Sequence, residues 1–314
     1  MKNKNTKEQV NIEMLAASFG TTEQEVTDSC KVLLNQMDPE YSVVSGTGRD
    51  DLILEVLTRI DSDTQKIGAP ERTERWQSGW QENLTDFRKN AYNLATLTPK
   101  FIRRDQPIRF NGDYIVPNEP HFEHLYFNLF REWLFDKYFS SYDTIYDIGC
   151  GSSYNLSKLC RKFPEKKVYG FDFVQSSVDI VNDLALHHGF NSEGRLFNLI
   201  EPDFEIELEE NSLVFTSGVI EQVASKFEKF IDFLLEKKPS LVINIEPTYE
   251  VYEQDRLFDY LAAKFHKKRG YTQGYLPRLR ELEKQGKVEI LKVKRLNFGS
   301  LFMEGFTYMV WRPI

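Results

Sequence analysis

Short apolar runs alternate with amphipathic stretches through the second half of this chain. The apolar runs cover 145–148, 167–173, 195–199, 211–217 and 241–245. Between them, apolar residues recur at the spacing of one helix face, over 156–163, 177–188 and 223–236. This alternation of strand and helix predicts an α/β fold, with a parallel sheet covered by helices on both faces.

The end of the chain has a different pattern. Residues 251–286 are mainly helical in spacing, and two extended runs follow at 288–293 and 306–311. A loop with Gly299 and Gly305 joins these runs, so we expect them to pair antiparallel.

The first half of the chain has a mainly helical pattern. Amphipathic spacing predicts a pair of helices within 8–37 and further helices over 51–60, 71–97 and 121–139. The segments 42–50 and 61–70 have the composition of a loop and a linker, and four prolines exclude a long helix from 98–120. We therefore expect a small helical region (1–66), a helical and loop substrate cap (67–140) and an α/β domain (141–314) with a helical insert (249–286).

Composition and charge narrow the class of protein. Of the 314 residues, 41 % are hydrophobic and 14 % aromatic, enough for a large core and a pocket for a ring-shaped ligand. The three cysteines lack metal-ligand spacing, so no metal site is predicted. No apolar run approaches the length of about 20 residues that crosses a bilayer, and no signal peptide precedes the helices. We expect a soluble, cytoplasmic protein without a membrane partner.

The two helices within 8–37 also match a helix-turn-helix DNA reader in outline. Glu23, Glu25 and Asp28 lie on the second helix, however, where they would repel phosphates, and the net charge is −8. A small helical bundle is the better interpretation, and we expect no nucleic-acid partner. These helices also offer a surface for a homodimer.

A glycine turn follows the first strand of the α/β region. Gly149 and Gly151 break the run 145–148, and a helical pattern follows, so backbone N–H groups converge on one point. Asp147 lies at the turn, where a carboxylate suits a ligand with ammonium and hydroxyl groups better than a phosphate. A nicotinamide-binding enzyme remains the rival, but it needs a third glycine where this chain has Tyr154.

From 141 to 314 the sequence resembles the class I S-adenosylmethionine-dependent methyltransferases, which have a Rossmann-like fold. Asp147-x-Gly149-x-Gly151-x-Ser153 resembles their first motif, and Asp172 ends the second strand about twenty residues later. The segment 213–223 resembles their fourth-strand motif, with Gln222 where many members carry histidine, and Asn198 replaces a frequent acid. The closing pair of strands is also typical of the family, and it implies seven strands with the last one antiparallel.

The resemblance implies S-adenosylmethionine as cofactor and S-adenosylhomocysteine as product. The implied cofactor-binding residues are Asp147, Gly149, Gly151, Ser153, Asn155, Asp172, Phe173, Asn198, Ser217 and Gly218.

Methyl transfer from a sulfonium requires an aligned nucleophile, exclusion of water and, for a hydroxyl acceptor, a base. Candidates for the base and its helpers are Glu246, His266 and Glu221, which follow strands or lie in the insert. Glu246 also fits a helix-capping role, and His266 also fits a surface position among lysines. Candidates for substrate binding are Arg103, Arg104, Arg109, His121, Gln222, Tyr249, Arg269 and Tyr271.

These residues lead us to expect O-methylation of a small-molecule acceptor, either a sugar or another polar or anionic metabolite. N-methylation of an amine or a protein side chain is an alternative, because an amine needs no strong base. A methyltransferase-like binding or scaffold protein without activity is the alternative outside the enzymes.

Overall fold

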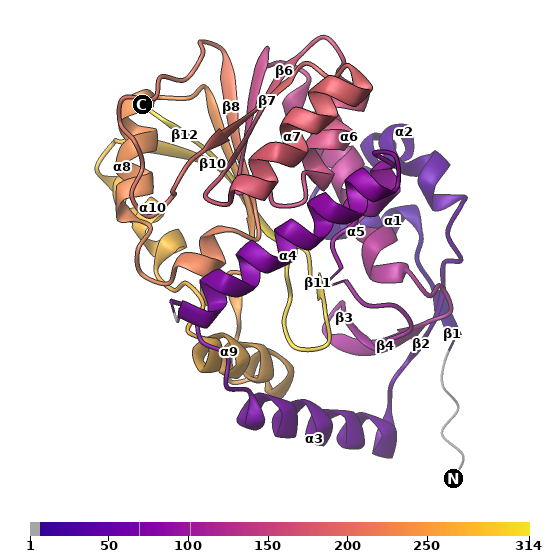
Figure 1. The fold of residues 1–314 in the computed structure, drawn as a ribbon. Coiled ribbons are helices and arrows are strands. Elements are labelled where there is room, and N and C mark those ends of the chain that lie inside the picture. Colours follow the sequence, from indigo (N-terminus) through magenta and orange to yellow (C-terminus); the bar gives the residue numbers. More distant parts are fainter. Residues whose placement is uncertain (1–6, 69, 101) are drawn as a thin grey trace.

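The computed structural model describes residues 7–68, 70–100 and 102–314, and a seven-stranded sheet lies at its centre (Figure 1). The order of the strands is β10-β12-β9-β8-β5-β6-β7. The strands are β5 (Thr144–Ile148), β6 (Lys167–Asp172), β7 (Ser192–Leu196), β8 (Ser212–Ser217), β9 (Leu241–Glu246), β10 (Val288–Arg295) and β12 (Thr307–Pro313).

The sheet confirms the predicted fold class. β5, β6, β7, β8 and β9 pair parallel with one another. β12 pairs antiparallel with both β9 and β10. The third strand begins and ends about three residues before its predicted position, because Leu196 is followed by a turn rather than by more strand.

Helices cover both faces of this sheet, because alternate strand residues point to opposite sides. Ile145 and Phe215 lie in one core with residues of α5, α6 and α7, while Tyr146 and Val214 lie in the other core with residues of α8 and α10. The helices of these two layers are α5 (Phe122–Leu134), α6 (Tyr154–Lys162), α7 (Gln175–His188), α8 (Glu228–Lys237) and α10 (Tyr275–Lys284).

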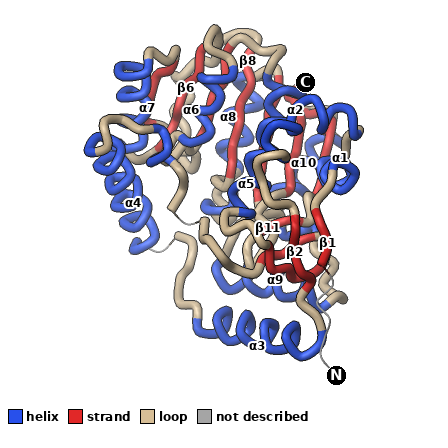
Figure 2. Tube along the Cα trace, turned by 90° about the vertical axis from the view of Figure 1, so that its right-hand side faces the viewer, coloured by secondary structure: helices blue, strands red, loops and turns tan. Residues whose placement is uncertain are grey.

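A second, five-stranded sheet lies beside the first and was not predicted (Figure 2). Its order is β1-β2-β4-β3-β11, and all its pairs are antiparallel. The strands are β1 (Lys7–Gln9), β2 (Glu40–Val43), β3 (Ile108–Phe110), β4 (Asp113–Pro117) and β11 (Phe298–Gly299). It therefore combines strands from all three of the predicted parts of the chain.

The hairpin between β3 and β4 explains why the segment 98–120 is not simply irregular. Its two-residue loop is Asn111-Gly112, with φ of 49° and 87°, and Phe110 pairs with Asp113 across it. Asn-Gly is a strong local signal for this type of hairpin. The prolines lie outside the hairpin or at the last residue of β4, so they cost the ladder little.

The remaining helices lie around these sheets. They are α1 (Ile12–Phe19), α2 (Glu23–Leu34), α3 (Gly46–Ser62), α4 (Pro70–Lys89) and α9 (Leu257–Arg269), with short turns η1 (Leu94–Leu97), η2 (Phe135–Phe139), η3 (Ile220–Val223) and η4 (Tyr249–Val251). α3 begins five residues earlier than predicted, and the helix predicted over 223–236 is η3 followed by α8. Among the described residues, no helix has the length and apolar character needed to cross a bilayer.

A buried amide joins the centre of the sheet to its antiparallel edge. Asn244 donates from Nδ2 to Thr216 Oγ1 at 2.9 Å, and its Oδ1 accepts from Tyr275 at 3.0 Å and from Trp311 Nε1 at 2.8 Å. The side chain is fully buried. These bonds link β8, β9, β12 and α10 through one residue.

Asn244→Leu should lower the free energy of unfolding by about 2–4 kcal/mol, because it leaves buried donors of Tyr275 and Trp311 without an acceptor. Urea unfolding followed by far-ultraviolet circular dichroism measures this. Asn191→Leu, at an exposed asparagine, is the control and should change stability little. Equal losses in the two variants would contradict the role of the buried amide.

Candidate active site

The glycine turn between β5 and α6 has the geometry that the sequence predicted. Gly149 and Gly151 have φ of 72° and 53°, in a backbone region that residues other than glycine rarely adopt. A Cβ at Gly149 would lie 2.5 Å from Val219 Cγ2, and a Cβ at Gly151 would lie 2.8 Å from Trp80 Cζ2. Both glycines are therefore required by close packing as well as by backbone conformation.

Asp172 ties this turn to the end of β6. Its carboxylate accepts from the Gly151 N–H at 2.9 Å and from the Val174 N–H at 3.0 Å, and its side chain is buried. Burial raises its pKa to about 6, although the backbone donors act in the opposite direction. A ligand bound beside the glycine turn would therefore lie close to the Asp172 carboxylate.

Helix α5 presents polar side chains to the same place. Tyr154 OH donates to Asn128 Oδ1 at 3.0 Å and lies 3.0 Å from His124 Nε2. The Arg131 guanidinium donates to the same Asn128 oxygen at 2.5 Å and lies 4.8 Å from the centre of the Tyr154 ring. Tyr154, which replaces the third glycine, is therefore one of the contacts between α6 and α5.

Sequence reasoning missed Asn128 and Arg131. The signal that could have found them is their polarity on a strongly apolar helix, with His124, Asn128 and Arg131 spaced four and three residues apart. Arg131 is buried, and burial lowers the pKa of its guanidinium to about 10.

Several buried polar atoms around the turn have no hydrogen-bond partner within the described residues. They are Asp147 Oδ2, Asn155 Oδ1, Arg131 Nε and His124 Nδ1. Burial and the nearby Asp172 raise the pKa of Asp147 to about 7, while the charge of Arg131 opposes this. Unpaired buried donors and acceptors are costly in a folded protein. Both kinds occur here, so the place fits a ligand that carries an ammonium and a carboxylate.

The other predicted cofactor residues are less closely grouped. Phe173 follows Asp172 with 46 % of its surface exposed. Ser217 is the last residue of β8, the neighbour of β5, and Gly218 follows it. Ser153 is buried at the start of α6. Asn198 is exposed, and its side chain accepts from the Ile200 N–H within its own turn.

Glu246 lies at the end of β9 with its carboxylate bound to the neighbouring loop. Oε1 accepts from Thr216 Oγ1 at 2.8 Å and from the Val219 N–H at 3.2 Å, and Oε2 accepts from the Glu221 N–H at 3.3 Å. Burial raises its pKa to about 7. These contacts are of the kind that a capping carboxylate makes, and they hold the backbone of the loop that carries Glu221.

His266 is not at the surface, contrary to one interpretation of the sequence. It is fully buried in α9, and within the described residues neither ring nitrogen has a hydrogen-bond partner. Its ring centre lies 5.4 Å from those of Tyr252 and Tyr271 and 6.4 Å from that of Tyr249. Burial, together with the charge of Arg109, lowers its pKa to about 3.

The loop that carries Glu221 lies against the segment after α9. The Thr272 N–H donates to the Glu221 backbone oxygen at 3.1 Å, and the Tyr271 N–H donates to the His266 backbone oxygen at 3.1 Å. Gln222 donates to Glu221 Oε1 at 2.5 Å. The histidine and its tyrosines therefore lie close to the carboxyl ends of β8 and β9, where ligands of such sheets bind.

The three loop arginines do not form one group. Arg109 is buried, donates to the Phe258 backbone oxygen at 2.7 Å and lies 3.9 Å from Asp259, whereas Arg103 and Arg104 are exposed. Arg104 lies 3.9 Å from Asp105, so it has the local ion pair expected of a solvated loop.

The charges near Arg109 are balanced. Arg295 pairs with Asp259 at 2.6 Å and with Glu304 at 2.5 Å, so two arginines face two carboxylates. This balance gives no support to an anionic substrate.

The last two predicted substrate residues also have assigned places. Arg269 pairs with Asp63 at 2.7 Å and donates to the Tyr271 hydroxyl at 3.0 Å. His121 is exposed at the start of α5, away from this aromatic group. Of the substrate candidates, Tyr249 and Tyr271 therefore lie beside His266, Arg109 is near enough for its charge to act on the imidazole, and Arg269 joins the group through the Tyr271 hydroxyl.

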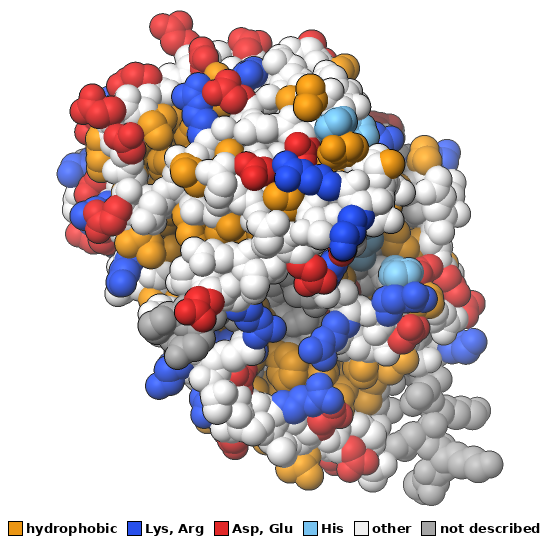
Figure 3. Space-filling view, viewed as in Figure 1, with side chains coloured by type: hydrophobic (Ala, Val, Ile, Leu, Met, Phe, Trp, Pro, Cys, Tyr) orange, Lys and Arg blue, Asp and Glu red, His pale blue; other side chains and the backbone are white. Residues whose placement is uncertain are grey.

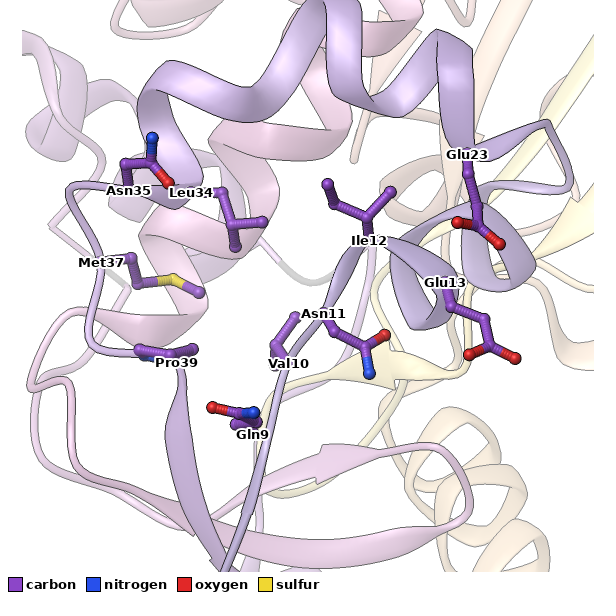
Figure 4. Close-up of a pocket in the computed structure, with 10 residues that line it drawn as sticks. All are labelled: Gln9, Val10, Asn11, Ile12, Glu13, Glu23, Leu34, Asn35, Met37 and Pro39. Atoms are coloured by element: carbon purple, nitrogen blue, oxygen red, sulfur yellow. The ribbon is translucent and has the colours of Figure 1, made fainter.

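A separate groove of about 630 Å³ opens beside β1, α1 and α2 (Figure 4). Val10, Ile12, Leu34 and Met37 supply its apolar side chains, and Glu13, Glu23 and amide side chains lie around them. No residue of the glycine turn lines it. Elsewhere, within the part of the chain that is described, no group of three or more histidines, cysteines or acids could hold a metal ion.

Comparisons with solved structures find methyltransferases. The methyltransferase domain of a bacterial Hen1 protein is 18 % identical, with a TM-score of 0.40, over 57 % of this chain and 93 % of that one. An S-adenosylmethionine-dependent methyltransferase from Aquifex aeolicus is 16 % identical, with a TM-score of 0.39, over 59 % and 89 %. The O-methyltransferase NcsB1 from neocarzinostatin biosynthesis is 14 % identical, with a TM-score of 0.38, over 60 % and 57 %.

No family model matches this sequence, and no curated protein matches it significantly. The antiparallel β12, which lies between β9 and β10, is established by the structure itself and agrees with the last strand expected from the resemblance. The chain has the seven-stranded α/β fold that the resemblance to the class I S-adenosylmethionine-dependent methyltransferases implies.

The buried imidazole predicts a pH dependence of stability. Below about pH 6.5 the unfolded chain binds a proton at His266, whereas the folded protein does so only near pH 3, so the free energy of unfolding should fall as the pH falls between these values. His266→Phe should therefore lose less stability than the wild type between pH 7 and pH 5 in urea unfolding. The exposed His121→Phe is the control, and a loss in His266→Phe as large as in His121→Phe would contradict the prediction.

Proposed function

We propose that this protein is an S-adenosylmethionine-dependent methyltransferase that methylates a hydroxyl of a small, ring-containing molecule. The observation that carries the proposal is the set of buried polar atoms at the glycine turn that have no hydrogen-bond partner within the described residues, Asp147 Oδ2, Asn155 Oδ1 and Arg131 Nε, beside the Asp172 carboxylate. Such a set has both signs of charge, which is what the amino-acid end of the cofactor requires. A phosphate ligand would instead place its negative charge beside the Asp147 carboxylate, and the two would repel each other.

The residues fit this cofactor in detail. Asp172 would accept from ribose hydroxyls, as the acid at the end of the second strand does in dinucleotide-binding folds. Arg131 would pair with the carboxylate of the amino-acid end, and Asp147 would accept from its ammonium, directly or through the backbone of the turn. The cofactor supplies an electrophilic methyl group when it is bound.

We favour His266 as the residue that binds the acceptor hydroxyl and takes its proton. Burial keeps the imidazole neutral, so a ring nitrogen is available to accept a hydrogen bond from the hydroxyl, although the lowered pKa makes it a weak base. As the methyl group is transferred, the hydroxyl oxygen becomes an acidic oxonium, and the ring nitrogen can then take its proton. Glu246 has a positioning role, since it holds the backbone of Glu221 through the loop after β8. Glu221 is placed between that loop and the segment after α9 and would orient the acceptor or the cofactor.

The acceptor class follows from the side chains around His266. Tyr249, Tyr252 and Tyr271 offer ring faces and edges, which pack well against a planar or sugar ring. The two arginines nearby are balanced by Asp259 and Glu304, so we favour an uncharged acceptor over an anionic one. The apigenin complex of an O-methyltransferase from Planctomyces limnophilus gives one example of a phenolic ring to test.

The cofactor assignment predicts micromolar binding of S-adenosylhomocysteine to the wild type. Asp172→Ala should weaken this binding at least tenfold, because hydrogen bonds to a buried carboxylate are worth about 1.5–3 kcal/mol. Isothermal titration calorimetry measures both constants. Asp179→Ala, at an acid on the following helix α7, is the control. Undetectable binding by the wild type would refute the assignment.

The role of His266 predicts a loss of turnover without a loss of cofactor binding. His266→Asn should lower kcat about 100-fold with any acceptor that the wild type methylates, in line with removal of a general base. Release of S-adenosylhomocysteine measures turnover across a panel of phenols, sugars and amines. His187→Asn is the matched control, and unchanged turnover in His266→Asn would exclude the histidine as base.

A further inference from the structure

Helix α4 places a tryptophan directly on the glycine turn. A Cβ built at Gly151 would lie 2.8, 3.1 and 3.2 Å from three atoms of the Trp80 indole. The ring therefore touches the turn at the very residue whose N–H is bound by Asp172. Figure 1 shows α4 crossing in front of the seven-stranded sheet.

The position of α4 is fixed on both sides of this tryptophan. Towards its end, Leu84 and Phe87 are buried and Arg88 pairs with Asp183 of α7 at 2.6 Å. Before its start, the Ile67 N–H donates to the Arg269 backbone oxygen at 2.8 Å. The helix thus connects the end of α9, near His266, with the helix that follows Asp172.

The segment after α4 also contacts the turn. Ser152, between the second glycine and α6, donates from its hydroxyl to the Leu97 backbone oxygen at 2.7 Å. The turn is therefore contacted from outside by two consecutive pieces of the chain, α4 and η1, both from the predicted substrate cap.

The two tryptophans of α4 differ from its core residues. Trp76 and Trp80 are stacked with ring centres 5.4 Å apart and an interplanar angle of 22°, and both keep part of their surface exposed. Leu84 and Phe87, on the same helix, have at most 2 % exposed. The pair is thus not the simple core packing that its spacing favours, and ring surface remains for a ligand to cover. Figure 3 shows a hollow below α4, with apolar and basic side chains around it.

We propose that Trp80 is a cofactor-contacting residue, and that α4 forms the outer wall of the cofactor site. Gly151 is bonded to Asp172 and follows Asp147 in the same turn, so a molecule bound to both Asp172 and the Asp147–Arg131 pair would lie against this turn, which the indole contacts. The inference rests on the proposed function, since it takes the ligand to be S-adenosylmethionine. The ring gives the adenosyl group or the sulfonium an aromatic surface, and both pack favourably on indole.

The experiment compares S-adenosylhomocysteine binding to Trp80→Ala, Trp80→Phe and Trp76→Ala by calorimetry and by intrinsic fluorescence. Trp80→Ala should bind about tenfold or more weakly, as for removal of an aromatic stacking partner, and Trp80→Phe should bind nearly as the wild type does. Trp76→Ala, one turn away on the same helix, should lose less than threefold. Ligand binding should change the tryptophan emission of the wild type and of Trp76→Ala but not that of Trp80→Phe.

Each result has a defined meaning. Equal affinities of Trp80→Ala and the wild type, or equal losses in Trp80→Ala and Trp76→Ala, would overturn the contact while leaving the proposed function intact. Failure of the wild type to bind S-adenosylhomocysteine would overturn the proposed function and this inference together. Thermal unfolding of the three variants shows whether a loss of affinity comes from misfolding. If Trp80→Ala is misfolded, the affinity and the tryptophan emission of Trp80→Phe decide whether the indole contacts the ligand.

Discussion

The hydrogen bond from the Gly151 N–H to the Asp172 carboxylate is the constraint around which the site is arranged. It fixes the turn after β5 to the end of β6, and the Gly149 N–H adds a 2.6 Å bond to the backbone oxygen of Phe171. Because β5 and β6 run parallel, the turn after β5 and the acid at the end of β6 lie together at the carboxyl ends of the strands. The start of α6, the polar face of α5 and the indole of Trp80 are all placed by contact with this turn.

Two groups of buried polar side chains contain atoms that have no hydrogen-bond partner within the described residues. One surrounds the turn, with Asp147 and Arg131, and the other contains His266. Burial of such groups without hydrogen bonds lowers stability, and proteins tolerate it mainly where a ligand completes the bonds. The first group fits a zwitterion, and the second fits a neutral molecule with a hydroxyl.

The N-terminal half of the chain contributes to both groups. The strand β3 carries Arg109 to α9, the segment before α4 is bound to Arg269, and α4 itself carries Trp80 to the turn. Its strands share a sheet with β11 from the other end of the sequence. The N-terminal half and the α/β part are thus joined by hydrogen bonds and close packing around the glycine turn and His266.

The sequence by itself determined the α/β sheet, its antiparallel edge and the glycine turn with Asp147 and Asp172, because these depend on local spacing and on glycine conformations. It also contains the Asn111-Gly112 pair, a signal for the β3–β4 hairpin of the second sheet that the sequence analysis did not use. Only the tertiary structure decided the rest. Arg109 was separated from Arg103 and Arg104 because it lies in a strand that faces α9, and His266 was buried because tyrosines from two segments, 249–252 and the one after α9, surround it. Contacts between residues far apart in the chain, such as Trp80 on Gly151, leave no pattern in local sequence, and so they appear only when the chain is folded.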